Sequence, residues 1–95
     1  MISYALLAPH PPLIVPAIGG ERLGDVEATV TGMQKMAEQV VQSNPDTLVF
    51  LTPHGNVFSD CLSALAEADL KGDFAAFGSS LGFACPNDLK LLAEL

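Results

Sequence analysis

Residues 47–55 read Thr-Leu-Val-Phe-Leu-Thr-Pro-His-Gly, and this stretch decides the fold that the sequence predicts. An unbroken apolar run that stops at a proline is typical of a short strand buried on both faces of a sheet. Residues 2–8, ISYALLA, have the same character and stop at the cluster Pro-His-Pro-Pro of residues 9–12. The sequence therefore predicts two buried strands, each followed two residues later by a histidine, His10 or His54.

A helix is predicted between the two strands, over residues 25–43. Asp25 is a suitable N-cap, and Asn44-Pro45 stops the helix because the residue before a proline avoids the α region. The apolar side chains recur with the helical period of 3.6 residues, at Val26, Val30, Met33, Ala37 and Val40. Strand, helix and strand form a β-α-β unit, so we expect parallel strands joined by a right-handed crossover.

The rest of the chain has weaker signals. Residues 62–66 suit either a strand or a short helix, residues 74–77 suit a strand that follows a turn at residues 71–73, and Pro86-Asn87-Asp88 is a helix start. That last helix has no stop signal before Leu95, and two strands cannot satisfy both edges of a sheet. Missing strands could belong to a longer parent chain, to a partner or to lost sequence, and we favour the first.

The predicted fold class is α/β, a three-layer-type domain with a mostly parallel sheet that begins with the β-α-β unit. We expect residues 1–95 to be the N-terminal part of this single domain. An apolar fraction of 49% in 95 residues suits the interior of such a larger domain.

Charge and composition argue against several classes of function. The net charge is −7, with 4 basic residues, so binding to nucleic acid or to an anionic membrane surface is disfavoured. No apolar run approaches the ~20 residues of a membrane helix, and no signal peptide is visible. Cys61 and Cys85 lack metal or redox spacing and read as unpaired, mostly buried thiols in a reducing compartment. The expected location is the cytoplasm.

His10 and His54 are the candidate metal ligands. Ligands of open α/β sheets bind beyond the carboxyl ends of the strands, and parallel strands place those ends on the same rim. Neighbouring strands lie ~4.8 Å apart, which lets two imidazoles converge on one ion. Prolines beside each histidine stiffen the backbone, and Gly55 permits a sharp turn.

Two histidines leave a metal site incomplete, because catalytic sites commonly use three protein ligands and keep a position open. The chain has no further histidine, and its nearest loop carboxylates, Asp60 and Glu21, read as solvated side chains. A zinc-dependent hydrolase is one alternative for such a site, since histidine and carboxylate ligands also suit Zn.

The sequence also resembles a known family. Residues 8–16, APHPPLIVP, and the later Pro-Asp-Thr of residues 45–47 with Thr-Pro-His-Gly at 52–55 look like the start of the class III extradiol ring-cleavage dioxygenases of the LigB type. Within that family the chain looks most like the Memo-like branch, and Lys-Gly-Asp-Phe at residues 71–74 and Pro-Asn-Asp-Leu at 86–89 fit that branch.

This resemblance implies a non-haem Fe(II) held by two histidines, matched by His10 and His54, and by a glutamate that lies beyond this chain. It implies a catecholic substrate, an aromatic diol, bound through both hydroxyls and cleaved with dioxygen. The family's acid/base histidine also lies beyond the chain, so its catalytic residues stay unknown and the chain alone is not expected to be active. Gly55 and Asn56 are candidate substrate-binding residues, although Asn56 also suits an ordinary turn.

Two other points are left open by the sequence. The alternative function is a non-catalytic, Memo-like metal-binding or protein-binding module, because Memo-like relatives include proteins without evident ring cleavage. The candidate macromolecular partners are a second copy of the chain, in a homo-oligomer, or the missing C-terminal portion.

Overall fold

A computed structural model describes all residues, 1–95, and divides them into two compact units. The first unit contains residues 1–46 and 73–81, and the second contains residues 47–72 and 82–95.

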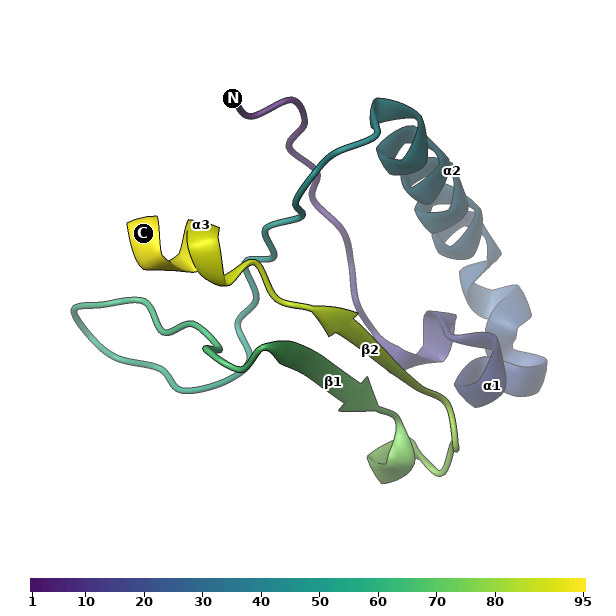
Figure 1. Ribbon diagram of the computed structural model, residues 1–95. Coiled ribbons are helices and arrows are strands. Elements are labelled where there is room, and N and C mark those ends of the chain that lie inside the picture. The colour runs from purple at the N-terminus through teal and green to yellow at the C-terminus, as the bar shows by residue number, and fades with distance from the viewer. The chain divides into compact units, whose positions relative to one another are not determined.

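The first unit is dominated by the long helix α2, Glu27–Ser43, as Figure 1 shows. This confirms the predicted helix and its stop, because Asn44 adopts a left-handed φ of 47° and its N–H donates to the carbonyl of Val41. The predicted cap was wrong. Asp25 belongs to the preceding 3₁₀ helix η2, Gly20–Val26, and the N-cap is Val26, which makes no side-chain cap bond.

The apolar stripe of α2 is half-buried rather than buried. Val30, Met33 and Val40 are shielded on one side, whereas Ala37 is exposed. Gly32 lies in the middle of the helix, and an added Cβ there would meet no atom within 4 Å. The glycine therefore serves no close approach in this structure.

Prolines start two short helices before α2. Pro11 is extended, with φ −67° and ψ 137°, and Pro12 begins the 3₁₀ helix η1, Pro12–Ile14. Pro16 then begins α1, Pro16–Gly19. Gly19 is the one buried residue of the chain, and a Cβ added there would collide with the carbonyl oxygen of Leu13.

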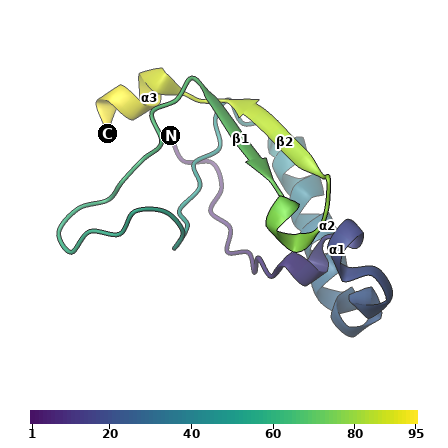
Figure 2. The same ribbon diagram turned by 90° about the horizontal axis from the view of Figure 1, so that it is seen from below.

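The only sheet is an antiparallel hairpin of β1, Asp69–Asp73, and β2, Gly82–Pro86, seen clearly in Figure 2. The strand predicted at residues 74–77 is instead a 3₁₀ turn, η3, Ala75–Phe77. The N–H of Phe74 donates to the carbonyl of Leu81, which closes the hairpin, and Gly78 takes a φ of 75° at the end of η3. Residues 71–73, predicted as a turn, form the end of β1.

The two predicted buried strands are not strands in this structure. Residues 2–8 and 47–52 have no ladder partner, so the parallel sheet is not shown, although helices with a small sheet are compatible with part of an α/β domain. An apolar run can indicate the buried character of a strand, but strand pairing also needs a neighbour. Both segments expose their apolar side chains, with Leu7 94% and Phe50 81% exposed.

The second unit ends in helix α3, Leu89–Glu94, whose start at Pro86-Asn87-Asp88 was predicted. Asp88 is the N-cap, and its carboxylate accepts from the N–H of Leu91 at 2.9 Å. The same carboxylate accepts a hydrogen bond from the hydroxyl of Thr47. The bond from Thr47, with that from Leu91, holds the pKa of the Asp88 carboxyl below its ordinary value.

None of the helices combines the length and the apolar character needed to cross a membrane.

Gly19 and Gly32 of the first unit provide a matched stability test. Gly32→Ala should stabilise the protein by roughly 1 kcal/mol, because alanine is the better helix former and the added methyl has open space. Gly19→Ala should destabilise it, because the methyl would collide with the Leu13 carbonyl. Urea unfolding of the full-length gene product, with hydrogen exchange of residues 27–43, measures both. A stabilising Gly19→Ala would contradict the packing described.

Acidification should weaken the bonds of Asp88. A carboxyl whose folded pKa is lowered stabilises the fold above its ordinary pKa, and this contribution is lost as pH falls through the lowered value. Asp88→Asn keeps an acceptor for Leu91 but cannot ionise. The stability difference between wild type and Asp88→Asn should therefore be constant above pH ~5 and shrink as the pH falls below the ordinary aspartate pKa of ~3.9. Urea midpoints across this range test the sign.

Candidate functional site

His10 lies in the first unit, in an exposed loop whose backbone is fixed by the prolines around it. The loop leads directly into η1, where the N–H of Ile14 donates to the carbonyl of Pro11 at 3.1 Å and that of Val15 to Pro12 at 3.0 Å. A proline also fixes φ and removes a backbone donor. The sequence thus places this imidazole on a stiff support that enters a short helix.

His54 lies in the second unit, on a tight turn that follows residues 47–52. Its N–H donates to the hydroxyl of Thr52 at 3.2 Å, so Thr52 orders the turn through its side chain. Gly55 has a φ of 106°, a region that residues with a Cβ avoid. The Thr-Pro-His-Gly motif is therefore a turn built from a hydroxyl acceptor, a proline and a permissive glycine.

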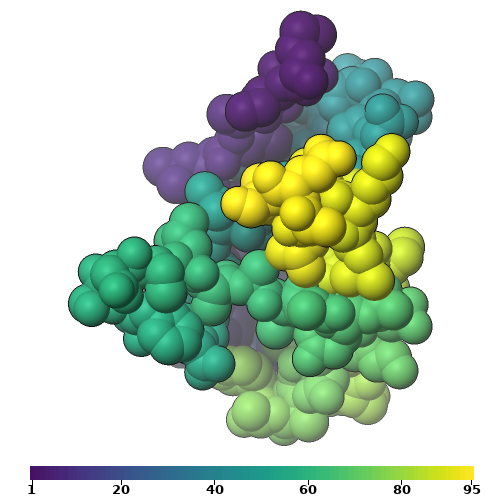
Figure 3. Space-filling model, turned by 60° about the vertical axis from the view of Figure 1, so that its left-hand side comes forward, coloured from purple at the N-terminus to yellow at the C-terminus, as the bar shows by residue number.

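The turn of His54 belongs to an excursion of the chain, residues 47–68, which we call the 47–68 segment. Figure 3 shows its teal to green part as a protruding lobe, and its side chains are exposed apart from Thr47. Ser63 crosses the segment and donates from its hydroxyl to the carbonyl of Asn56 at 2.8 Å. Asn56, a predicted substrate-binding residue, thus contributes its backbone to the order of the segment.

The structure does not test the predicted pairing of the two histidines. His10 and His54 belong to different units, and no group of three or more His, Cys, Asp and Glu side chains is arranged to hold a metal ion. Asp60 and Glu21 are exposed, in agreement with their reading as solvated carboxylates. Cys61 and Cys85 are free thiols, but both are exposed, so the prediction that they are mostly buried was wrong.

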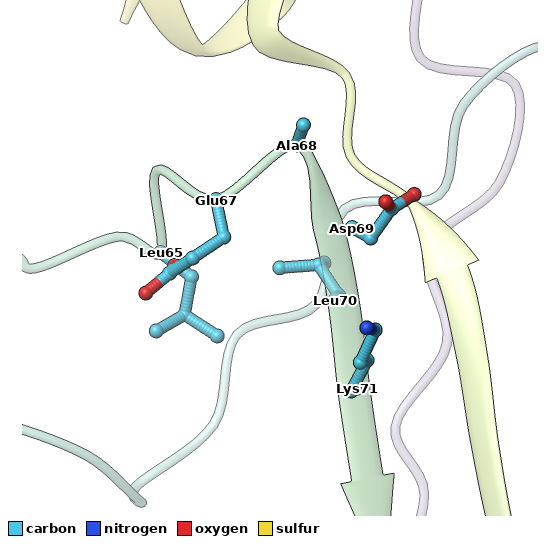
Figure 4. Close-up of a pocket in the computed structure, with 6 residues that line it drawn as sticks. All are labelled: Leu65, Glu67, Ala68, Asp69, Leu70 and Lys71. Atoms are coloured by element: carbon cyan, nitrogen blue, oxygen red, sulfur yellow. The ribbon is translucent and has the colours of Figure 1, made fainter.

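A shallow depression lies along β1, away from the histidine turn in sequence. Figure 4 shows that the side chains of β1 alternate, with Leu70 on one side of the strand and Asp69 and Lys71 on the other. The residues that line the depression are Leu65, Glu67, Ala68, Asp69, Leu70 and Lys71. It is open to solvent, and no buried polar side chain points into it.

The sequence interpretation missed three residues that order the second unit. Thr52 holds the His54 turn, and Asn87 and Asp88 make the bonds that bring distant parts of the unit together. The pattern Thr-x-His signalled the first of these, because a hydroxyl two residues before an N–H is typical of such turns. Contacts across 20 residues or more leave no periodicity in the sequence.

Comparison with known proteins identifies the family. Residues 4–95 match the family model described as the catalytic LigB subunit of aromatic ring-opening dioxygenase. The chain belongs to this LigB family, as its paired Pro-His motifs led us to expect.

One curated relative is Protein CA_C1420 of Clostridium acetobutylicum, which is 32% identical over 71 residues. The alignment covers 75% of this chain but 15% of the relative, so the chain spans only a small part of that protein's length. No solved structure matches the chain.

The strained turn after His54 gives a local prediction. Gly55→Ala should destabilise the turn by roughly 1–3 kcal/mol, because its φ of 106° is unfavourable for a residue with a Cβ. Gly24→Ala is the control, since that glycine has no positive φ and an added Cβ meets nothing. Hydrogen exchange of residues 52–58 in the full-length gene product should rise in the first variant only. Equal exchange in both variants would contradict the turn geometry.

Proposed function

We propose that this chain contributes two ligands, His10 and His54, to the non-haem Fe(II) centre of an extradiol, catechol-cleaving dioxygenase. The observation that carries the proposal is the match of residues 4–95 to the catalytic subunit of ring-opening dioxygenases. The chain's only two histidines both follow a proline in that region. Neither histidine is needed by a hydrophobic core, because both are exposed.

The chemistry of the two loops fits a metal ion of this type. Neutral imidazole is a good ligand for iron, and each histidine stands on a backbone stiffened by proline. A ligand on a stiff support loses less conformational entropy when it binds. When bound, Fe(II) with two histidines and one carboxylate keeps adjacent positions open for a chelating diol and for dioxygen.

The remaining parts of the centre are proposed to come from outside residues 1–95. The third ligand is then a glutamate there, as the resemblance to the extradiol dioxygenases of the LigB type implies. The same surroundings would supply strands that pair with residues 2–8 and 47–52 in a mostly parallel sheet. Such pairing would cover apolar side chains that are now exposed, Phe50 among them. It would also bring the two strand ends to the same rim.

The residues after His54 have supporting tasks in this proposal. Gly55 leaves open space beside its backbone, because an added Cβ would meet no atom within 4 Å. A substrate can therefore approach the chain closely there. Asn56 is held by the bond between its carbonyl and Ser63, so its exposed side-chain amide can donate a hydrogen bond to a substrate oxygen. Both contacts would orient the diol next to the metal ligand His54.

The test uses the full-length gene product, purified anaerobically and loaded with Fe(II). His10→Ala and His54→Ala should each weaken Fe(II) binding by at least about 100-fold, because each removes a direct ligand. Asp60→Ala and Glu21→Ala, which remove exposed loop carboxylates, should leave binding unchanged. The wild-type enzyme should convert a member of a catechol panel to a coloured ring-fission product, and both histidine variants should not.

Two outcomes would contradict the proposal in different ways. Unchanged metal content in both histidine variants would remove the metal site itself. Tight iron binding without any ring-fission product would remove the catalytic part and favour a non-catalytic, Memo-like binding module. Zinc instead of iron after anaerobic purification would favour a hydrolase.

A further inference from the structure

Both ends of the 47–68 segment are fastened to the same two residues, Asn87 and Asp88. At the start of the segment, the hydroxyl of Thr47 donates to the carboxylate of Asp88. At its end, the side-chain amide of Asn87 donates to the carbonyls of Leu65 and Glu67, each at 2.9 Å. The backbone N–H of Asn87 donates to the carbonyl of Ala68, also at 2.9 Å.

These four bonds use all three N–H donors of Asn87 and one carboxylate oxygen of Asp88. An asparagine amide has two N–H donors, and those of Asn87 bind the carbonyls of Leu65 and Glu67, just before the chain enters β1. The two carboxylate oxygens of Asp88 are divided between Thr47 and the first turn of α3. If the oxygen and nitrogen of the Asn87 amide were exchanged, the amide could not make these contacts. A neutral, shorter side chain in place of Asp88 could not make them either. We call Asn87 and Asp88 the latch.

The bonds of the latch are made to Thr47, Leu65, Glu67 and Ala68, and the segment that they close transmits order to His54. The bond of Ser63 to the carbonyl of Asn56 ties the two arms of the segment together beyond the latch. The bond of the His54 N–H to Thr52 then fixes the turn at the far end of the first arm. Otherwise the segment is exposed and has no buried side chain to hold it. Its conformation therefore relies on polar contacts, and these bonds are among them.

We propose that Asn87 and Asp88 are positioning residues, which hold both ends of the 47–68 segment so that His54 is presented in one place to its metal ion. The inference rests on the proposed function, because it assigns His54 the role of a ligand. Second contacts that orient a metal ligand commonly affect metal affinity by 10–100-fold. A latch that acts through the backbone should have an effect at the lower end of this range.

The variants separate positioning from helix capping. Asp88→Asn keeps an oxygen that accepts from Leu91, and Thr47→Val removes the hydroxyl while keeping the shape of the side chain. Asn87→Asp removes both amide donors at nearly constant size. The matched control is Asp73→Ala, which removes a carboxylate bonded to the N–H of Ala75 in the hairpin turn but leaves the 47–68 segment untouched.

Two measurements are made on the full-length gene product, at a temperature where every variant is folded. Fe(II) affinity under anaerobic conditions should fall about tenfold in Thr47→Val, Asp88→Asn and Asn87→Asp. The Thr47→Val/Asp88→Asn double variant should be no weaker than either single variant, because the two share one bond. Hydrogen exchange of residues 48–64 should rise in these variants, while that of residues 27–43 stays constant. Asp73→Ala should change neither quantity.

The failures of the two proposals are distinguishable. If His54→Ala abolishes Fe(II) binding but the three latch variants bind as tightly as wild type, the positioning role is overturned and the metal site stands. If His54→Ala has no effect on Fe(II) binding, the proposed function fails, and the positioning of a ligand fails with it. A rise in exchange of residues 48–64 together with a loss of affinity in all three latch variants supports the inference.

Discussion

The order of the second unit depends on the hydrogen bonds that Asn87 and Asp88 make to chain far away in sequence. They join the start of α3, the beginning of residues 47–52 and the return of the chain into β1. No side chain of this unit is buried, so apolar packing does not determine its conformation. Polar contacts that are specific in direction therefore decide where the turn with His54 lies. The same dipeptide starts the last helix, which couples helix formation to closure of the segment.

A second constraint is the apolar surface that the chain leaves uncovered. Large hydrophobic side chains are exposed in residues 2–8 and 47–52, and no hydrophobic residue of the chain is buried. Burial of apolar surface contributes about 25 cal/mol per Å², so covering these two segments would stabilise the fold substantially. Both segments lead directly to a histidine, and the chain belongs to the LigB family. A sheet that covers the two segments therefore has a physical rationale in this family.

Local signals in the sequence predicted the helices well and the sheet poorly. Helix α2 has a periodic stripe and an Asn-Pro stop, and α3 has a capping aspartate, all within a few neighbouring residues. The hairpin escaped detection because β1, DLKGD, is polar and contains a glycine, which gives little of the usual strand character. In the structure Leu70 and Gly72 are the less exposed positions of β1, but a glycine carries no apolar signal in the sequence. The apolar runs at residues 2–8 and 47–52 looked like strands, but strand formation needs partners that neither run has here.

The candidate site, like the fold, has one part that local sequence signals predicted and one part that they did not. The residue types of the candidate site, two histidines after prolines and a glycine after the second, were visible in the sequence, and they lie in the region that matches the family model. What sequence reasoning could not supply was the support of His54, since the bonds of Thr47 to Asp88 and of Asn87 to Leu65 join positions 41 and 22 residues apart. No local pattern encodes such a pairing, because either partner alone looks like an ordinary polar residue of a turn or cap.

The energies involved explain why so few contacts suffice. Closing a flexible loop of roughly twenty residues costs about 3 kcal/mol in length-dependent chain entropy. The three bonds donated by Asn87 are each expected to contribute about 0.5–1.5 kcal/mol, and together they are of the same size as this cost. The closed segment is thus close to balance, and the bond of Thr47 to Asp88 tips it towards closure. A metal ion bound through His54 would stabilise the closed segment further, because it would favour the closed over the open segment. Metal binding and latch closure should consequently strengthen one another, since each selects the same conformation of residues 47–68.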